Sequence, residues 1–184
     1  MKKRILFVYN VHRRFVDIDR DLLSERYDVQ AWYQPTRWVN LPVLTQAVRR
    51  CDLVFCWFAS WHSLMPVWLA RLHRKPAHVH IGGYDVARVP EAGYGSQRGG
   101  LRKAVSRAVI HSATTMTASS EFLRNEAINN SGADPKRITT LYLGIVPVSS
   151  NVVSPQPLNK RDMILTVGGI WRENLLRKGL LPFV

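Results

Sequence analysis

Short apolar runs rich in β-branched and aromatic residues recur along the chain, and this recurrence constrains the fold more than any other feature. We expect six strands, at 4–10, 27–33, 52–58, 77–81, 113–118 and 137–143. Segments with helical spacing or helix-start signals lie between them, at 17–25, 41–49, 61–73, 101–108 and from 119 onward. Strand and helix in alternation predict an α/β fold: a Rossmann-like, doubly wound parallel sheet with helices on both faces.

A second feature lies near the C-terminal end, where a strand-like run at 163–170 contains Gly168 and Gly169 and a basic helix start with Lys178 follows. Glycine lets backbone N–H groups approach an anion, and the helix dipole favours negative charge there. The pattern predicts a phosphate site at the opening of another α/β unit. We therefore expect a first domain at 1–146, a linker rich in Pro, Ser and Asn at 147–161, and the truncated start of a second domain at 162–184.

Composition fits a globular protein, with 46% hydrophobic and 21% charged residues in 184. The two cysteines, Cys51 and Cys56, match neither zinc-ligand spacing nor a disulfide framework, so we expect buried free thiols in a reducing compartment and no metal site. The apolar run after Lys2-Lys3-Arg4 ends at Asn10, too soon for a secretory signal. These features predict a cytoplasmic protein whose membrane contact, if it has one, is peripheral at the inner face.

The net charge of +13 indicates contact with a polyanion: nucleic acid, an anionic lipid surface or a phosphorylated substrate. Candidates for such a contact are Arg98, Arg102, Lys103 and Arg107, which could line a cleft or lie on anionic lipid, the alternative being a solvated helix face. No helix-turn-helix, zinc-finger or RNP-type strand motif is recognisable, so nucleic acid is an unlikely partner. A basic α/β binding module for nucleic acid or an anionic membrane surface stays open as the alternative function.

Three segments in order carry a resemblance to a known family. Lys75-Pro76 leads through the fourth strand into Gly82-Gly83-Tyr84-Asp85; residues 117–122, 132–138 and 143–146 follow; residues 164–169 with Lys178-Gly179 come last. Together they resemble the GT-B glycosyltransferases of family 4, with the chain as the N-terminal half of a GT-B fold plus the start of the donor domain. Gly82 stands where that family has a loop histidine and Gly169 where it has an arginine. The resemblance therefore assigns no catalytic residue.

The resemblance implies a hexosyltransferase-type enzyme that moves a sugar from a nucleotide-sugar donor, as substrate rather than cofactor, to a glycan, lipid-linked or small-molecule acceptor. It implies retention of configuration and no metal. Gly168, Gly169, Arg172 and Lys178 would hold the donor phosphates, where charge develops as the nucleoside diphosphate leaves. One domain cannot enclose donor and acceptor together, so we expect the isolated chain to be inactive.

The acceptor side of such an enzyme would lie where the strands of the first domain end, because open α/β sheets bind ligands at that edge. His12 and Arg13 follow the first strand, Trp61 follows the third, and Gly82, Gly83 and Asp85 follow the fourth. Simpler explanations stay open: Asp85 could cap a turn, His12 and Arg13 could form a solvated loop, and Trp61 could be core. Alternatively Trp61 could stack on a sugar ring or insert at a membrane interface.

Overall fold

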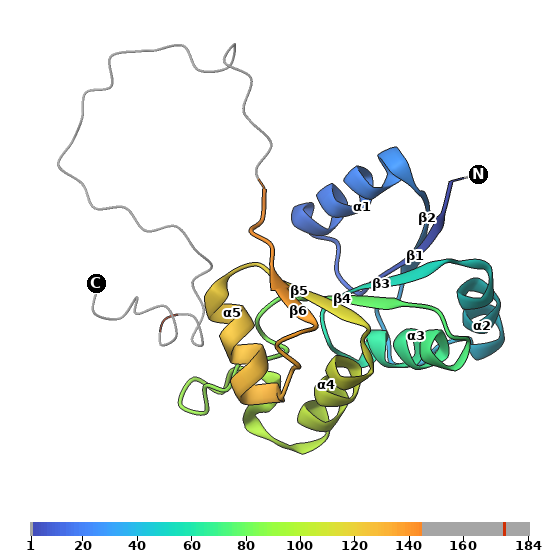
Figure 1. The fold of residues 1–184 in the computed structure, drawn as a ribbon. Helices are drawn as coiled ribbons and strands as arrows, with labels where there is room; N and C mark the ends of the chain where they lie inside the picture. Colours follow the sequence, from blue (N-terminus) through green and yellow to red (C-terminus); the bar gives the residue numbers. More distant parts are fainter. Residues whose placement is uncertain (1, 145–174, 176–184) are drawn as a thin grey trace, which may run out of the picture. The chain divides into compact units, whose positions relative to one another are not determined.

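Six parallel strands form one sheet in the computed structural model, which describes residues 2–144 and 175 (Figure 1). The strands are β1 (Arg4–Tyr9), β2 (Asp28–Tyr33), β3 (Leu53–Trp57), β4 (Ala77–Ile81), β5 (Thr115–Ala118) and β6 (Ile138–Thr140). Their order across the sheet is β2-β1-β3-β4-β5-β6, and every neighbouring pair is parallel. The strand order reverses direction beside β1, so the sheet is doubly wound with its switch point between β1 and β3.

Helices cover both faces of this sheet. They are α1 (Arg14–Arg26), α2 (Leu41–Arg50), α3 (Trp61–Leu72), α4 (Gly100–Ser112) and α5 (Glu121–Glu126), with a 3-10 turn at Ser96–Arg98 and a π-helical turn at Ala127–Ser131. Figure 1 shows α1 on one side of the sheet and α2, α3, α4 and α5 on the other. The predicted Rossmann-like α/β fold is confirmed.

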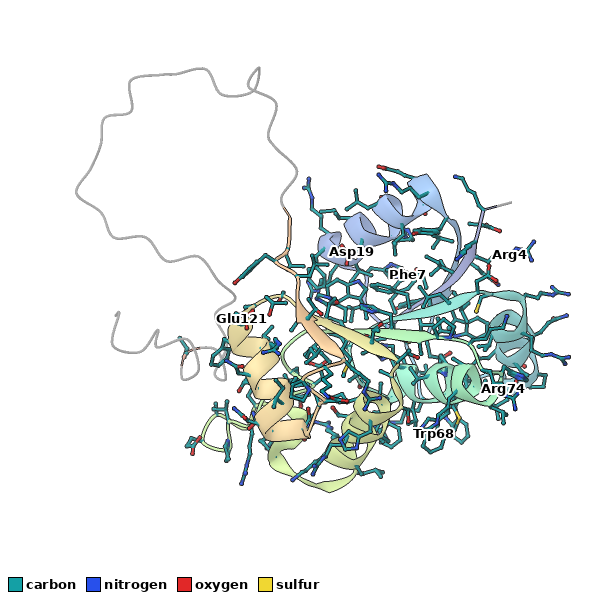
Figure 2. All side chains as sticks on the ribbon, viewed as in Figure 1. Arg4, Phe7, Asp19, Trp68, Arg74 and Glu121 are labelled. Atoms are coloured by element: carbon teal, nitrogen blue, oxygen red, sulfur yellow. The ribbon has the colours of Figure 1, made fainter. Side chains whose placement is uncertain are left out.

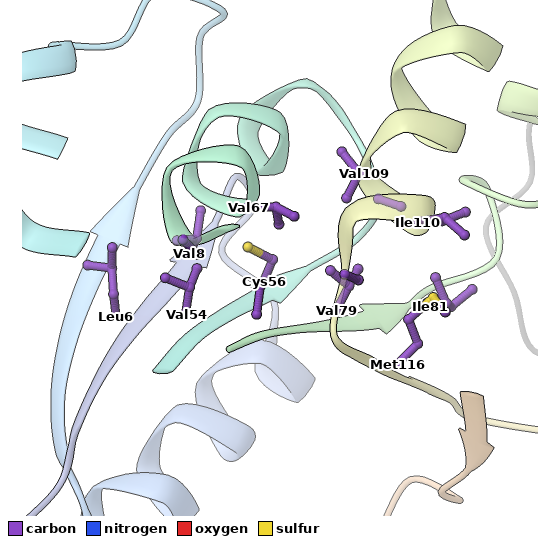
Figure 3. Packing of buried hydrophobic residues seen from close by; sticks show 14 of the residues in the cluster. Leu6, Val8, Val54, Cys56, Val67, Val79, Ile81, Val109, Ile110 and Met116 are labelled. Atoms are coloured by element: carbon purple, nitrogen blue, oxygen red, sulfur yellow. The ribbon is translucent and has the colours of Figure 1, made fainter. Parts of the chain in front are cut away.

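The larger core lies between the sheet and the helices α2, α3 and α4 (Figure 3). Alternate strand residues point into it, because successive side chains of a strand face opposite sides. Fully buried examples are Leu6, Val8, Val54, Cys56, Val79 and Ile81 from the strands, and Val48, Val67, Val109 and Ile110 from the helices. Cys51 and Cys56 are both buried and unpaired, as expected, and burial raises the pKa of the Cys56 thiol to about 12.

The smaller core lies beneath α1 and is aromatic. Phe7, Tyr9 and Trp57 point to this side, where Val16 of α1 covers them, and Figure 2 shows Phe7 between strand and helix. Phe7 stacks on Phe55 of the next strand at 5.2 Å. Burial of β1 by helices on both sides explains why its sequence is apolar without alternation.

The ends of two elements differ from the sequence-based expectation. Helix α1 begins at Arg14 rather than at residue 17, because the added turn buries Val16 against the aromatic core. Strand β6 covers Ile138–Thr140 rather than 137–143, because it is an edge strand whose partner β5 offers three register pairs. Leu141 and Tyr142 beyond it are exposed.

The chain divides by its contacts into two units, Met1–Tyr142 and Leu143–Val184. The sheet and its helices belong to the first unit. In the second unit, the structure describes residues 143, 144 and 175. The linker at 147–161 and the domain start at 162–184 therefore stay predictions.

Candidate functional site

The carboxyl ends of the parallel strands meet at one edge of the sheet, beside the switch point between β1 and β3. A crevice forms there in doubly wound folds because neighbouring connections leave toward opposite faces. The loops that border it follow β1, β2, β3 and β4. Two of them, after β3 and β4, have unusual backbone conformations that bring them together.

Phe58 turns the chain sharply between β3 and α3. Its φ is +70°, a left-handed conformation that non-glycine residues rarely adopt. Three hydrogen bonds hold it: its N–H donates to the His80 carbonyl (2.9 Å), and its own carbonyl accepts from the Ser63 hydroxyl (2.7 Å) and the Ser60 N–H (3.2 Å). Strained backbone of this kind gathers at functional sites, where the surrounding structure enforces it.

His62 reinforces the same turn from the first turn of α3. Burial lowers the pKa of its imidazole to about 4, so the ring is neutral. Its Nε2 donates to the Trp57 carbonyl at 2.6 Å, since a carbonyl can only accept. The start of α3 is thereby tied to the end of β3.

The carboxylate of Asp85 joins the loop after β4 to the loop after β3. It accepts from the Ala59 N–H (2.9 Å), the Gly83 N–H (2.8 Å) and, more weakly, the Gly82 N–H (3.3 Å). The side chain is buried, and burial raises its pKa while these three donors oppose the change. The Asp85 carboxylate thus holds the two loops together, and it positions the side chains that these loops carry.

The long loop between β4 and α4 is anchored in the same place. The buried Gln97 donates through Nε2 to the Asp85 carbonyl (2.8 Å) and to the Ser106 hydroxyl (3.1 Å), and that hydroxyl donates to the same carbonyl (2.8 Å). Gly95, with φ +100°, has no room for a side chain because a Cβ would collide with the Ala87 carbonyl. The loop therefore has one packed conformation along this stretch.

The glycines after β4 are required by the same packing. A Cβ on Gly82 would overlap the ring of Phe58, so glycine here permits the close approach of the two loops. Gly83 has φ +114°, which only glycine adopts readily. Gly82 and Gly83, both predicted at the acceptor side, therefore lie at the carboxyl edge beside the turn made by Phe58.

A cavity of about 270 Å³ lies at this edge, between the loops after β2, β3 and β4 and the start of α4. Its polar and aromatic lining comes from Arg37, Ser60, Trp61, Tyr84, Ser96 and Arg102. No carboxylate is among the described residues that line it. It is smaller than the roughly 300–1,000 Å³ typical of drug-sized ligand sites, so it fits a small group.

Two arginines of the cavity are held by aromatic residues rather than by acids. The guanidinium of Arg37 lies 4.9 Å from the centre of the Trp61 ring, a cation–π contact. Arg102 donates through Nη1 to the Tyr84 hydroxyl at 3.0 Å. Within residues 2–144 neither guanidinium forms an ion pair with a carboxylate. Both side chains are exposed, so their charges face solvent and the cavity rather than an acidic side chain.

His12 and Arg13, after β1, lie at the same edge of the sheet. The His12 ring lies 5.4 Å from that of Tyr9 and 4.4 Å from that of Tyr33, so it packs among aromatic side chains at the ends of β1 and β2. Arg13 is exposed, and its backbone precedes α1. The structure does not bring either residue into the cavity with Trp61.

Comparison with protein families identifies the domain. The family model described as glycosyl transferase 4-like domain matches residues 8–144, from within β1 to beyond β6. The chain belongs to the glycosyl transferase 4-like family. The predicted resemblance is confirmed, and the edge described above is the edge of a glycosyl transferase 4-like domain.

Solved structures support the same fold at low sequence identity. The chain is similar to MnaA of S. aureus in a co-structure with UDP, at TM-score 0.53 and 10% identity over 75% of this chain and 43% of that one. It is also similar to a putative UDP-N-acetylglucosamine 2-epimerase from Listeria monocytogenes, at 0.52 and 9% over 75% and 44%. The domain thus spans less than half the length of these structures. A search of curated proteins finds no match.

Sequence reasoning missed most of the residues that line the cavity, among them Arg37 and Tyr84. Tyr84 lies inside the Gly82–Asp85 motif, so its position in the motif was available as a signal. Arg37 comes from an irregular segment after β2 that carries no motif, and only the tertiary structure places it over Trp61. Arg102, expected either to line a cleft or to lie on anionic lipid, is exposed near the start of α4 and lines the cavity.

The four residues expected at donor phosphates, Gly168, Gly169, Arg172 and Lys178, lie outside the described residues. In the part of the chain that the structure describes, no three His, Cys, Asp or Glu side chains come together as metal ligands do. No helix there is long and apolar enough to cross a membrane.

Two neutral histidines of β4, His78 and His80, lie on the face of the sheet opposite the larger core. Burial lowers the pKa of His78 and of His80 to about 4. His78 hydrogen-bonds the Thr115 and Thr117 hydroxyls (2.9 and 3.0 Å), and His80 Nδ1 lies 2.9 Å from the Thr117 hydroxyl. His80 is a buried residue of the sheet.

Proposed function

We propose that this glycosyl transferase 4-like domain forms the acceptor side of an enzyme that transfers a hexosyl group from a nucleotide-sugar to an acceptor hydroxyl. In the reaction the acceptor oxygen bonds to the anomeric carbon, the bond from that carbon to the diphosphate breaks, and the acceptor proton is released. The products are the glycoside and a nucleoside diphosphate. Membership of the family over residues 8–144 is the observation that carries the proposal.

The donor side would begin with Gly168, Gly169, Arg172 and Lys178 and continue beyond Val184. Basic side chains and backbone amides would neutralise the departing diphosphate without a metal, and no cofactor is needed. The UDP in the MnaA co-structure, a protein of similar fold, is consistent with a nucleotide-linked donor. Retention of the anomeric configuration belongs to the same proposal.

On the acceptor side, Trp61, Gly82 and Gly83 border the crevice, while His12 and Arg13 flank it from β1. Asp85 acts through the loops that it joins, because its carboxylate is already bonded to backbone amides. Asp85 can therefore stabilise a turn and still contribute to the site through the loops that it joins.

The test compares the 184-residue chain with the polypeptide encoded when the reading frame continues past Val184. We expect release of nucleoside diphosphate from a nucleotide-sugar only by the longer polypeptide, unaffected by EDTA, and NMR of the product should show the donor's anomeric configuration. Turnover by the 184 residues alone, or a natural stop codon after Val184, would contradict the proposal.

A second candidate function is peripheral contact with an anionic membrane at the inner face. A basic cavity of about 550 Å³ at the amino-terminal edge of the sheet favours it, with Arg71, Arg74, Lys75, His111 and Arg137 in its lining. Figure 2 shows Arg74 and Arg4 at this edge. We expect salt-sensitive sedimentation with phosphatidylglycerol vesicles. Binding to DNA or RNA at physiological ionic strength without binding to vesicles would instead support the nucleic-acid alternative.

A further inference from the structure

We infer that the cavity between Arg37, Trp61, Tyr84 and Arg102 binds a phosphoryl group of the acceptor, so that the acceptor is a phosphorylated molecule. The inference rests on the proposed function, because it names the substrate class of that same site. No comparison assigns a ligand to these residues, and none of the four is a residue that the donor phosphates would use.

Charge is the first argument. Two guanidinium groups line a cavity of about 270 Å³ that has no carboxylate among its described lining residues. Placing two cations beside one small cavity is unfavourable unless an anion or solvent screens them. Arginine also presents paired N–H donors that match the oxygens of a phosphate, so these side chains suit that anion particularly well.

Positioning is the second argument. Arg37 lies over the Trp61 ring and Arg102 donates to the Tyr84 hydroxyl, so each guanidinium is oriented by a contact that leaves its charge unneutralised. Tyr84 is itself held edge-on against the ring of Tyr94, with 5.0 Å between ring centres. Preorganised donors of this kind lower the entropy lost when a ligand binds.

A buried donor without an acceptor is the third argument. The Trp61 indole Nε1 is inaccessible to solvent and has no hydrogen-bond partner among the described residues. Such donors are rare because an unsatisfied buried N–H destabilises the fold. Trp61 lines the cavity through other atoms of its side chain, so a phosphoryl oxygen bound there becomes an acceptor for this group once the indole turns toward it, and that turn would shift the indole resonance.

Loops anchored by hydrogen bonds carry the lining residues of the cavity. Ser60 and Trp61 follow the turn that Asp85 holds through the Ala59 N–H, and Tyr84 and Ser96 belong to the loop anchored by Gln97. The cavity, at about 270 Å³, has room for a phosphoryl group and for the part of the acceptor next to it, and the remainder of the acceptor would extend into the crevice.

The experiment titrates the 184-residue chain with inorganic pyrophosphate at constant ionic strength and follows the indole and arginine Nε–H resonances by NMR. We expect a dissociation constant on the order of 1 mM, a shift of the Trp61 indole resonance, and binding about tenfold weaker in Arg37→Gln and in Arg102→Gln. Arg26→Gln, which removes an exposed charge at the end of α1, is the matched control and should bind like the wild type. Thermal unfolding of each variant verifies that it folds.

Equal weakening by Arg26→Gln, unchanged binding in both cavity variants, or a stationary Trp61 indole resonance overturns the inference. Two further arms separate the sources of the phosphoryl group. Binding of glycerol 3-phosphate supports a soluble acceptor, and Arg102-dependent sedimentation with phosphatidylcholine vesicles containing phosphatidic acid supports a lipid acceptor.

The two proposals fail in different ways. If the longer polypeptide glycosylates an acceptor but pyrophosphate does not bind the cavity, the phosphoryl inference is wrong and the transferase stands. If pyrophosphate binds through Arg37 and Arg102 but the longer polypeptide releases no nucleoside diphosphate, the anion site stands and the transferase is wrong.

Discussion

Replacement of Asp85 by alanine should destabilise the domain far more than the loss of one surface carboxylate. Its two shorter hydrogen bonds, from Ala59 (2.9 Å) and Gly83 (2.8 Å), are bonds to a buried charged acceptor. Each is worth about 1.5–3 kcal/mol, and removal of the acceptor leaves the donors unpaired. Their sum is about 3–6 kcal/mol before the cost of burying the carboxylate is subtracted.

Burial raises the pKa of Asp85, which shows that desolvation of the carboxylate opposes folding. Removal of the carboxylate removes this cost and so offsets part of the loss of stability. We therefore expect Asp85→Ala to lower the free energy of unfolding by about 3 kcal/mol. Asp85→Asn retains one acceptor oxygen and should lower it by about 2 kcal/mol. Both losses are smaller than the roughly 5–15 kcal/mol by which a typical domain is stable, so the variants should still fold.

Urea unfolding at 25 °C, followed by far-ultraviolet circular dichroism, measures the difference. A loss of about 3 kcal/mol corresponds to a midpoint lower by roughly 1–2 M urea. Asp52→Ala is the matched control, because the exposed Asp52 carboxylate accepts one backbone N–H, from Arg4 at 2.8 Å. It should cost about 1 kcal/mol or less. If Asp85→Ala costs no more than Asp52→Ala, the account of Asp85 as the joint between the two loops is refuted.

Three further predictions follow from single contacts. The pKa values of His62, His78 and His80 are lowered to about 4, so the free energy of unfolding should be full above pH 6.5 and fall as the pH drops from 6.5 to 4, as urea midpoints would show. Glutamine at both 78 and 80 should make this fall shallower, with His62 retaining the remainder, and an unchanged fall would contradict the assignment. Gly82→Ala should lower the thermal midpoint by several degrees because its Cβ overlaps Phe58; an unchanged midpoint would argue against that packing. Ser120→Ala should cost about 1 kcal/mol in urea unfolding, since its hydroxyl caps α5, and a neutral result would mean the cap is dispensable.

The sequence was a good guide to elements whose pattern is local. Apolar runs predicted all six strands, and the helical segment expected from 119 onward is α5, which begins at Glu121, directly after Ser120, whose hydroxyl accepts a hydrogen bond from the Leu123 N–H. The start of α1 was predicted too late because Val16 is helical for a tertiary reason, its burial against aromatic residues of the sheet. Likewise, the short ladder between β5 and β6 decides where β6 ends.

The candidate site was likewise predictable where the signal is local and unpredictable where tertiary contacts decide it. Gly82, Gly83, Asp85 and Trp61 could be expected at the carboxyl edge because each follows a strand of a parallel sheet. That the Asp85 carboxylate points into the backbone rather than the crevice could not be expected, because its partner Ala59 comes from another loop. His12 was expected at the same edge, but its place among aromatic rings depends on the neighbouring strand β2.

By itself, then, the sequence determined the parallel α/β architecture and the family, because strand and helix periodicity and short motifs are local properties of the chain. Only the tertiary structure decided that Arg37 and Arg102 share one cavity with Trp61 and Tyr84. The physical reason is that this convergence depends on strand order and on long-range hydrogen bonds that hold two loops together. Neither strand order nor a long-range hydrogen bond can be recognised from the types of the residues that it brings into contact.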